Sequence, residues 1–390
     1  TYTVGSGGDY ASLTNAGGIF EALNTFGASG NITIEIISDL SGENGTVALN
    51  EIAGGFSVLI KPSAVIRPEG AIGYTISGAS TSAIIRLNGA DNVTIDGSFS
   101  GGTAGDTIGG DSMLRNLTVQ NTNVAVANEA VISVQTGTNG AQNVTIKNVN
   151  VLGQDPVETL IGIAVGGNAV GSSGADNDNV RIENCSFRRS FIGVYNAGTS
   201  AANQNTGNVV TKNDLTGTGA DRLRRAGMLF FNHDGLEVSL NDIAGIDTNE
   251  SIDTYGIGLG TQAVSTTVTT SGSVTNSLVT RNRITGVVSS STVGFSAFGI
   301  GVAGGTTGPN TISNNMISGV TAPSTSPDLV SGIFVTGVTG SDTRVYHNSI
   351  SLTGDRGAVA SQIGSYGIAI TGATPVVDLK NNIFYNTQTS

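Results

Sequence analysis

Tryptophan is absent from this chain of 390 residues, and cysteine and positive charge are scarce. The 17 Lys and Arg residues stand against 29 Asp and Glu residues, which disfavours a nucleic-acid-binding role because phosphates demand a basic surface. The one cysteine, Cys185, excludes an intrachain disulfide and a thiolate metal site. No apolar run reaches the roughly 18 residues that a membrane-spanning helix requires.

Glycine is abundant instead, with 57 copies, while charged residues make up only 12% of the chain. Thr, Ser and Asn fill the remaining polar positions, a composition that favours strands and tight turns over helices. A compact chain of this length would ordinarily divide into about two or three domains. Internal repeats override that expectation.

One motif recurs eight times: a short segment of alternating apolar and polar residues that ends on an asparagine, as in NTISNNMISG from position 310. The shared asparagines are spaced 28 to 41 residues apart and fall at Asn148, Asn184, Asn213, Asn241, Asn282, Asn315, Asn348 and Asn381. A second motif, exemplified by YGIGL and FGIGV, lies between them and is centred on Gly162, Gly193, Gly227, Gly256, Gly299, Gly332 and Gly367.

Both motifs have the period-two alternation and the Val, Ile and Thr content of strands, and no stretch within the repeats shows a helical apolar period. The repeats therefore predict a parallel β-solenoid, in which each period forms one coil and equivalent residues stack about 4.8 Å apart.

The repeats resemble the right-handed parallel β-helix of the pectate-lyase-like superfamily, over residues 84–390. The resemblance implies an all-β fold of roughly 10 to 12 coils, with a cap over residues 1–30 and a single β-helix domain over residues 31–390. GGIFEALNTFG, with Ile19, Leu23 and Phe26 on one face, resembles the amphipathic helix that caps such folds. No capping element follows NNIFYNTQTS, so we expect the native polypeptide to continue beyond Ser390.

The recurring asparagine suits a turn that needs a left-handed residue, where asparagine and glycine are the low-cost choices. Its amide can also bond to the equivalent amides of neighbouring coils and so form a ladder along the axis. We expect all eight asparagines to stack in one such column, with Gly97 in the equivalent position of an earlier coil.

Polysaccharide-cleaving members of the superfamily usually work on the outer face near the strand that carries the glycine motif. If the residue after each glycine points inward, the outward positions are the glycines themselves together with a column that includes Ala164, Tyr195 and Leu229. A reversed orientation brings Tyr255, Phe298 and Tyr366 outward. Neither column contains an acid, a base or a metal ligand, and the catalytic strings of polygalacturonase-like hydrolases do not occur.

The position after the asparagine stacks Asp214, Asp242 and Arg283, which would place the two carboxylates about 5 Å apart. That separation suits the catalytic pair of a retaining glycosidase. A solvated ion-pair patch beside the arginine is the alternative interpretation.

Three further groups are candidates for binding. The densest basic cluster, Arg188, Arg189, Arg222, Arg224 and Arg225, could grip the carboxylates or sulfates of a glycan, or could pair with neighbouring acids. Asp176 and Asp178, in DNDN, could hold calcium, although the full spacing of a calcium loop is missing and a plain loop explains them as well. His233, beside Asp234, is most simply a turn residue.

The opening TYTVGSGGDYASLTNA resembles the start of long surface proteins of Bacteroidota, many of which are exported by the type IX system and some of which are adhesins. In that group, an Asp-Ser or Asp-Thr pair followed by a small or aliphatic residue can accept O-glycans. DTI and DSM make Thr107 and Ser112 candidate glycosylation sites.

These observations predict a non-catalytic β-helix of a secreted or cell-surface bacterial protein. Such a chain would serve as a rigid stalk, an adhesin or a glycan-binding surface, partnered by a polysaccharide or by other parts of a larger surface protein. No cofactor is expected beyond the calcium candidate. The alternatives are a polysaccharide lyase or hydrolase with an atypical site at Asp214 and Asp242, and a trimeric tailspike-like protein.

Overall fold

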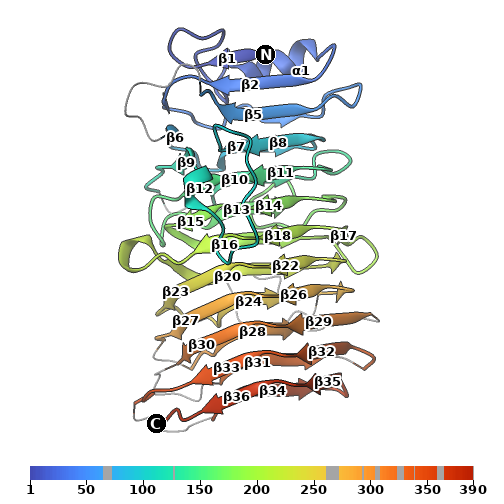
Figure 1. Cartoon of the computed structure of the whole chain (residues 1–390). Coiled ribbons are helices and arrows are strands. Elements are labelled where there is room, and N and C mark those ends of the chain that lie inside the picture. Colours follow the sequence, from blue (N-terminus) through green and yellow to red (C-terminus); the bar gives the residue numbers. More distant parts are fainter. Residues whose placement is uncertain are drawn as a thin grey trace.

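A computed structural model describes residues 1–64, 73–125, 128–260, 272–291, 294–303, 308–322, 329–337, 339–357 and 364–389. The chain winds as a right-handed parallel β-helix, which confirms the predicted fold class (Figure 1). Three long parallel sheets run along the axis, with 12, 11 and 10 strands in the described residues; we name them sheets A, B and C. Each coil contributes one strand to A, then to B, then to C.

Sheet A contains β1 (Tyr2–Val4), β2 (Ile32–Ile36), β5 (Val58–Pro62), β8 (Val93–Asp96), β11 (Thr145–Lys147), β14 (Arg181–Glu183), β18 (Val209–Thr211), β22 (Glu237–Ser239), β26 (Leu278–Thr280), β29 (Pro309–Ser313), β32 (Asp342–Tyr346) and β35 (Val376–Lys380). Sheet B contains β3 (Leu40–Ser41), β6 (Tyr74–Gly78), β9 (Leu117–Asn121), β12 (Val149–Leu152), β15 (Ser186–Arg188), β19 (Asp214–Leu215), β23 (Asp242–Thr248), β27 (Arg283–Ser289), β30 (Met316–Thr321), β33 (Ser349–Leu352) and β36 (Ile383–Asn386).

Sheet C contains β4 (Leu49–Asn50), β7 (Ala83–Asn88), β10 (Ala130–Gln135), β13 (Ile161–Gly166), β16 (Ser190–Ala197), β20 (Leu223–Phe231), β24 (Thr254–Leu259), β28 (Ala297–Ala303), β31 (Val330–Gly337) and β34 (Ser365–Gly372). A small parallel sheet of β17 (Asn205–Thr206), β21 (His233–Asp234) and β25 (Val274–Thr275) lies between sheets C and A. Two short 3-10 helices, η1 (Ser112–Leu114) and η2 (Gly219–Asp221), complete the described elements.

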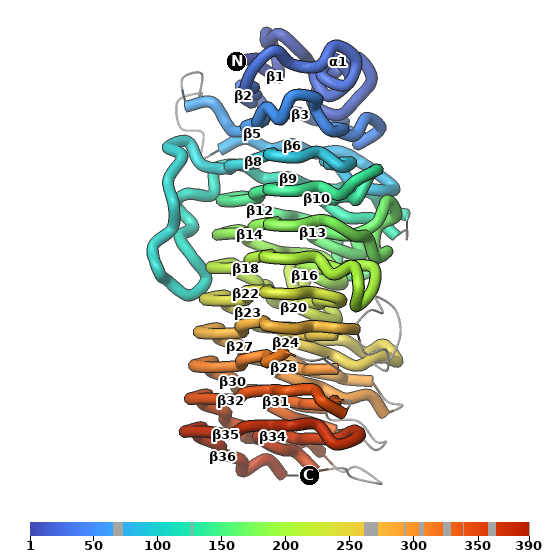
Figure 2. The backbone as a smooth tube through the Cα atoms, turned by 90° about the vertical axis from the view of Figure 1, so that its right-hand side faces the viewer, coloured from blue at the N-terminus to red at the C-terminus, as the bar shows by residue number. Residues whose placement is uncertain are grey.

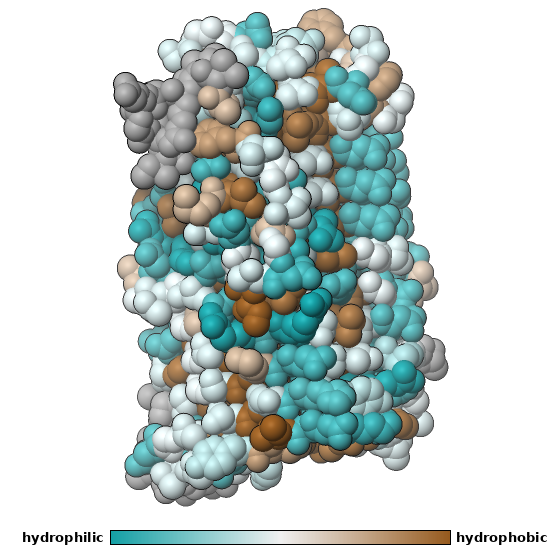
Figure 3. Space-filling model, viewed as in Figure 1, coloured by the Kyte–Doolittle hydropathy of each residue, from teal (hydrophilic) through white to brown (hydrophobic). Residues whose placement is uncertain are grey.

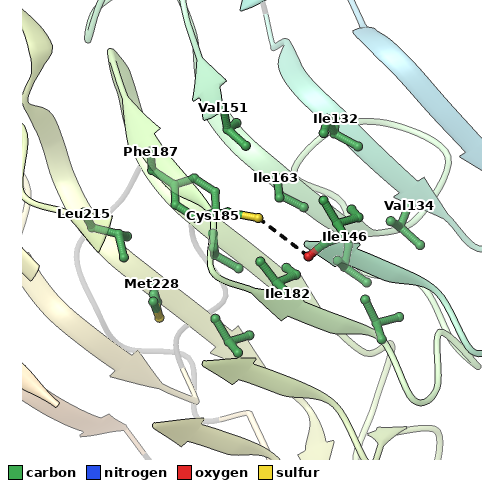
Figure 4. Close-up of a cluster of buried hydrophobic side chains, with 14 of the residues drawn as sticks. Ile132, Val134, Ile146, Val151, Ile163, Ile182, Cys185, Phe187, Leu215 and Met228 are labelled. Atoms are coloured by element: carbon green, nitrogen blue, oxygen red, sulfur yellow. Dashed lines mark hydrogen bonds between the residues drawn. The ribbon is translucent and has the colours of Figure 1, made fainter. Parts of the chain in front are cut away.

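The interior is a continuous stack of aliphatic side chains from all three sheets. Figure 4 shows one level of it, where Cys185 lies among Ile146, Ile182 and Phe187 and its Sγ lies 3.6 Å from the Ile146 carbonyl oxygen. Burial raises the pKa of the Cys185 thiol to about 12. The thiol therefore acts as a small core side chain and not as a nucleophile.

Helix α1 (Ile19–Phe26) closes the first coils. The Asn24 side chain donates to the Ala48 carbonyl oxygen and accepts from the Asn50 amide, so it occupies the free edge of β4 much as a neighbouring strand would. The predicted buried face is wrong at one position, because Phe26 is 84% exposed and Phe20 is buried. The helix ends at Phe26, and that side chain projects beyond the coil it covers.

The asparagine ladder runs along the short turn between sheets A and B. Asn213 donates through its backbone and side-chain amides to Oδ1 of Asn241, each at 3.0 Å. The same pair of bonds repeats down the axis, and the ladder consists of Asn213, Asn241, Asn282, Asn315, Asn348 and Asn382. These six side chains fix the turn of six successive coils.

The predicted single column of eight asparagines is wrong for three of them. Strand register aligns Glu183 with Thr211, so Asn184 stacks on Lys212 and Cys185 takes the ladder position. Asn148, Asn184 and Asn381 instead occupy the left-handed position of the turn, with φ near 60°, 51° and 54°. In the intervening coils that position belongs to Lys212, Leu240, Arg281, Asn314 and His347.

The seven recurring glycines of sheet C have their Cα atoms turned toward the solenoid core and not toward the solvent. A Cβ on Gly256 would lie 2.7 Å from Cγ2 of Ile284 and 2.5 Å from the Gly299 carbonyl oxygen. Gly256 and Ile257 both point inward, whereas Tyr255 and Gly258 flank them on the outside. The outward assignment of the glycines was therefore wrong, because the strand breaks strict alternation at this point.

Candidate functional site

A long insertion covers the turn between sheets A and B on the upper coils. Residues 98–115, which we call the strap, leave the end of β8, descend along the outside of the solenoid and return to β9; Figure 2 shows them as the cyan excursion at the left. The Gly109 amide donates to the Leu240 carbonyl oxygen at 2.9 Å. The strap thus crosses the coils that carry Asn148, Asn184 and Lys212.

Asn148 and Asn184 hold this strap. Asn148 donates through Nδ2 to the Gly102 carbonyl oxygen at 3.0 Å, and Asn184 donates to the Asp111 carbonyl oxygen at 3.0 Å. The Asn184 side-chain oxygen accepts the Asp111 amide at 2.7 Å. Asn184 also donates through Nδ2 to Asn148 Oδ1 at 2.7 Å, so these two amides bond to one another and at the same time attach an external segment.

The predicted column of acids lies immediately beside the strap. Register places Asp214 opposite Asp242 and Asp242 opposite Arg283 on the outer face of sheet B. Arg283 donates through Nε to Asp242 Oδ1 at 2.8 Å, and its Nη2 contacts the other carboxylate oxygen. Asp242 is therefore engaged at both oxygens.

Asp214 is engaged by two arginines. Its Oδ2 lies 2.8 Å from Arg188 Nη2 and 3.4 Å from Arg115 Nη1, and its Oδ1 accepts from Thr216. Burial alone would raise the pKa of Asp214, but hydrogen bonds from Arg188 and Thr216, together with the charges of both arginines, outweigh it and hold that pKa below its usual range. Asp214 is thus an ionised partner in an ion-pair group and is unsuited to donate a proton near neutral pH.

Arg115 was missed in the sequence. It ends the strap with its side chain largely buried, and it donates through Nε to the Asn184 carbonyl oxygen at 3.1 Å and through Nη2 to the Asn184 side chain at 3.1 Å. The available signal was length: 20 residues separate Asp96 from Leu117, whereas every later coil passes from sheet A to sheet B within one or two residues.

Each arginine of the predicted basic cluster has an intramolecular partner. Arg188 pairs with Asp214, Arg189 with Asp221 at 2.6 Å, and Arg224 with Glu250 at 2.6 Å. Arg222 donates to the Gly219 carbonyl oxygen at 2.8 Å. Arg225 is fully buried, and burial lowers its pKa to about 10, partly offset by Tyr255, Asp253 and Tyr195. The structure therefore assigns these side chains intramolecular contacts.

The other predicted candidates lie in turns. Asp176 is exposed in a left-handed turn, and Asp178 accepts the Thr206 amide of the next coil at 2.7 Å. No group of three or more acidic, histidine or cysteine side chains in the described ranges is arranged to hold a metal ion. His233 is fully buried, with Nε2 3.0 Å from the Asn196 carbonyl oxygen. Thr107 and Ser112 are both exposed on the strap.

The outer face of sheet C is closed by a second apolar cluster. Tyr195, Leu229, Tyr255 and Phe298 point outward from the sheet but are almost completely buried. Phe298 stacks on Phe334 with ring centroids 4.6 Å apart. This packing fills the outer face of sheet C over these coils with apolar side chains.

Sheet B presents a more open surface on the lower coils, at the lower left of Figure 1. Its outward columns there form a shallow groove of about 310 Å³ beside the Arg283–Asp242 pair. In the same region of Figure 3, hydrophobic patches are set among residues of intermediate hydropathy. Met316 and Tyr385 line the groove with 52% and 56% of their surfaces exposed.

No family model and no curated protein matches the chain. The A-module of the mannuronan C-5 epimerase AlgE6 of Azotobacter vinelandii is similar at 13% identity and a TM-score of 0.45, over 95% of this chain and 93% of that one. The Agl-KA catalytic domain is similar at 12% identity and a TM-score of 0.31, over 90% of this chain and 59% of that one. At this level of similarity, neither likeness assigns an activity to this chain.

None of the described helices is both long and apolar enough to cross a membrane.

Proposed function

We propose that this chain is the rigid, non-catalytic β-helix of a secreted or cell-surface bacterial protein, and that it serves as a stalk or adhesin with a glycan-binding surface. The observation that carries the proposal is the state of the stacked carboxylates, since Asp214 and Asp242 are both engaged by arginines. A continuous core and the ladder supply the rigidity that a stalk needs.

Three finer parts of the proposal rest on the sequence. The opening segment suggests a Bacteroidota-type protein exported by the type IX system. Thr107 and Ser112 would then carry O-glycans, and their exposure on the strap would allow this. Calcium would bind weakly or adventitiously beside Asp176, because the second carboxylate of the candidate pair, that of Asp178, already accepts the Thr206 amide.

The rival function is a polysaccharide lyase or hydrolase that uses Asp214 and Asp242, and the in-register stacking of these two carboxylates is the observation in its favour. A panel of acidic and neutral polysaccharides, followed by assays for new reducing ends and unsaturated products, separates the two functions. We expect no turnover. Turnover that disappears in the double variant Asp214→Asn and Asp242→Asn, with its circular dichroism unchanged, would establish the enzyme instead.

A further inference from the structure

The groove on the lower part of sheet B is built from in-register columns. One column runs down the axis as Thr285, Ser318, Ser351 and Tyr385, with each residue the direct strand partner of the next. Successive strands in a sheet lie about 4.8 Å apart, so this column offers one hydroxyl for each coil at a constant spacing. Tyr385 adds an aromatic ring to this column.

The adjacent column consists of Arg283, Met316, Ser349 and Ile383 and supplies apolar surface at two of these positions. Met316 and Ile383 stand two positions along their strands from Ser318 and Tyr385 and are 52% and 66% exposed. Apolar side chains gathered in one groove, beside hydroxyls and an exposed ring, are the usual sign of a binding surface. The mixture of exposed apolar side chains with hydroxyl groups in both columns fits an amphipathic ligand.

The groove is close to electrically neutral. Arg283 is the charged residue among those that line it, and its guanidinium is already paired with Asp242 through two contacts. A polyanionic chain would have to compete with Asp242 for that guanidinium. An uncharged ligand has no such cost.

We propose that this groove binds an extended, uncharged glycan that lies along the solenoid axis, with one sugar ring on Tyr385 and successive rings beside Ser351 and Ser318. A pyranose ring has an apolar face of C–H groups and a rim of hydroxyls, and its length in an extended chain is close to the rise of one coil. The inference rests on the proposed glycan-binding function and adds the face and the class of ligand.

The test measures binding by isothermal titration calorimetry. The probes are three neutral β-1,4-linked hexasaccharides, of glucose, xylose and mannose, and one acidic hexasaccharide of galacturonic acid. Tyr385→Ala removes the ring, and the double variant Ser318→Ala with Ser351→Ala removes two hydroxyls. Tyr366→Ala is the matched control, because Tyr366 lies on sheet C of the preceding coil, outside the groove, and is 43% exposed.

We expect at least one neutral hexasaccharide to bind more tightly than the acidic one. Tyr385→Ala should weaken that binding about fivefold or more, as loss of a stacked ring does, and Tyr366→Ala should leave it unchanged. Neutral binding that survives Tyr385→Ala and the double serine variant would overturn the groove while leaving a glycan-binding function elsewhere. Preference for the acidic probe would overturn the uncharged class, and failure of all four probes would overturn both the inference and the glycan-binding part of the proposed function.

Discussion

His233 is a buried titratable residue in the turn that follows sheet C. It is fully buried, and burial lowers its pKa to about 4, against which hydrogen bonds to Asn196 and Asn205 act only in part. Because this value lies below that of an unfolded histidine, about 6.5, the unfolded state binds the proton more readily. The neutral imidazole therefore favours folding above pH 6.5, and this contribution is lost as the pH falls toward 4.

We predict that the free energy of unfolding drops by about 3 kcal/mol between pH 7 and pH 4 on account of His233. The variant His233→Gln should show a flatter dependence over this range, measured by urea unfolding at several pH values. The chain has one other histidine, His347, which is exposed, so His347→Gln is the control and should retain the wild-type dependence. An unchanged slope in His233→Gln would show that other groups titrate there.

Glu129 has the opposite effect on the pH dependence of stability: it destabilises the fold as the pH rises. Burial raises the pKa of its carboxyl to about 7, and the nearby Glu158 and Asp155 add to the effect while a hydrogen bond from Asn123 opposes it. A raised pKa means that its stabilising contribution is present below about 4.5 and is lost as the pH rises through 7. Glu129→Gln should therefore melt at a higher temperature than the parent above pH 7 and at the same temperature below pH 4. Glu51→Gln, at an exposed site, should match the parent at both.

Neighbouring asparagines contribute unequally to the free energy of unfolding, as Asn314 and Asn315 show. Asn315 is fully buried and bonds to Asn282, Asn348 and the Val279 carbonyl oxygen. Asn315→Ala leaves several buried polar groups without hydrogen-bond partners and should lower the free energy of unfolding by about 3 kcal/mol. Asn314 is exposed in the left-handed region, so Asn314→Gly should change stability by less than about 0.5 kcal/mol. Equal losses in urea unfolding would contradict the ladder assignment.

At the scale of the strand, the glycine column sets how closely sheets B and C approach. An alanine at Gly256 would place its Cβ against Ile284 and the Gly299 carbonyl oxygen. We predict that Gly256→Ala lowers stability by about 1 to 3 kcal/mol, as overpacking of a filled core does. Gly105→Ala, in the strap with no neighbour within 4 Å of the new carbon, should be neutral in the same thermal melts. A neutral Gly256→Ala would mean that the sheets can separate locally without cost.

The repeat could be predicted from the sequence because each strand obeys the same local rule as its neighbours. Period-two alternation and the recurrent turn specify the coil, and they do so many times over. The slip of one residue at Asn184 could not be predicted, because asparagine suits both the left-handed position and the ladder position beside it. Only the register of Glu183 with Thr211 separates the two.

The candidate site was less predictable than the coil for a related reason. The stacking of Asp214, Asp242 and Arg283 follows from the period and was predicted. Arg115 belongs to no repeat, and its partners Asn184 and Asp214 lie 69 and 99 residues away. A contact of that kind leaves no periodic trace, so the part that Arg115 plays beside Asp214 appears only in three dimensions.

At the scale of the whole molecule, the strap connects coils that otherwise touch only their neighbours. In a solenoid, stability is close to a sum of coil and interface terms, and an external brace makes the braced coils unfold together. Lys212 contributes to this brace, since its Nζ lies 3.3 Å from Asp106 of the strap. The upper coils should therefore open less readily than their own packing allows.

Arg115→Ala should release the strap. We expect chymotrypsin to cleave at Phe99, Met113 or Leu114 at least about tenfold faster in this variant, because protease sensitivity follows local opening. Arg344→Ala, which breaks an ion pair with Asp342 on sheet A far from the strap, is the control. Identical cleavage rates in the two variants would show that Arg115 does not hold the strap closed.

The lower ladder has an even spacing, so its coils are built from sequence intervals of equal length. Asn282, Asn315 and Asn348 follow one another at intervals of 33 residues, and the strap ends above them. Deleting or duplicating such an interval would remove or add one whole coil and change the reach of the protein by about 4.8 Å, with every remaining strand still facing an equivalent partner. Duplication or deletion of this interval in the gene can thus lengthen or shorten the protein by whole coils while each new coil keeps the packing surfaces of the existing ones.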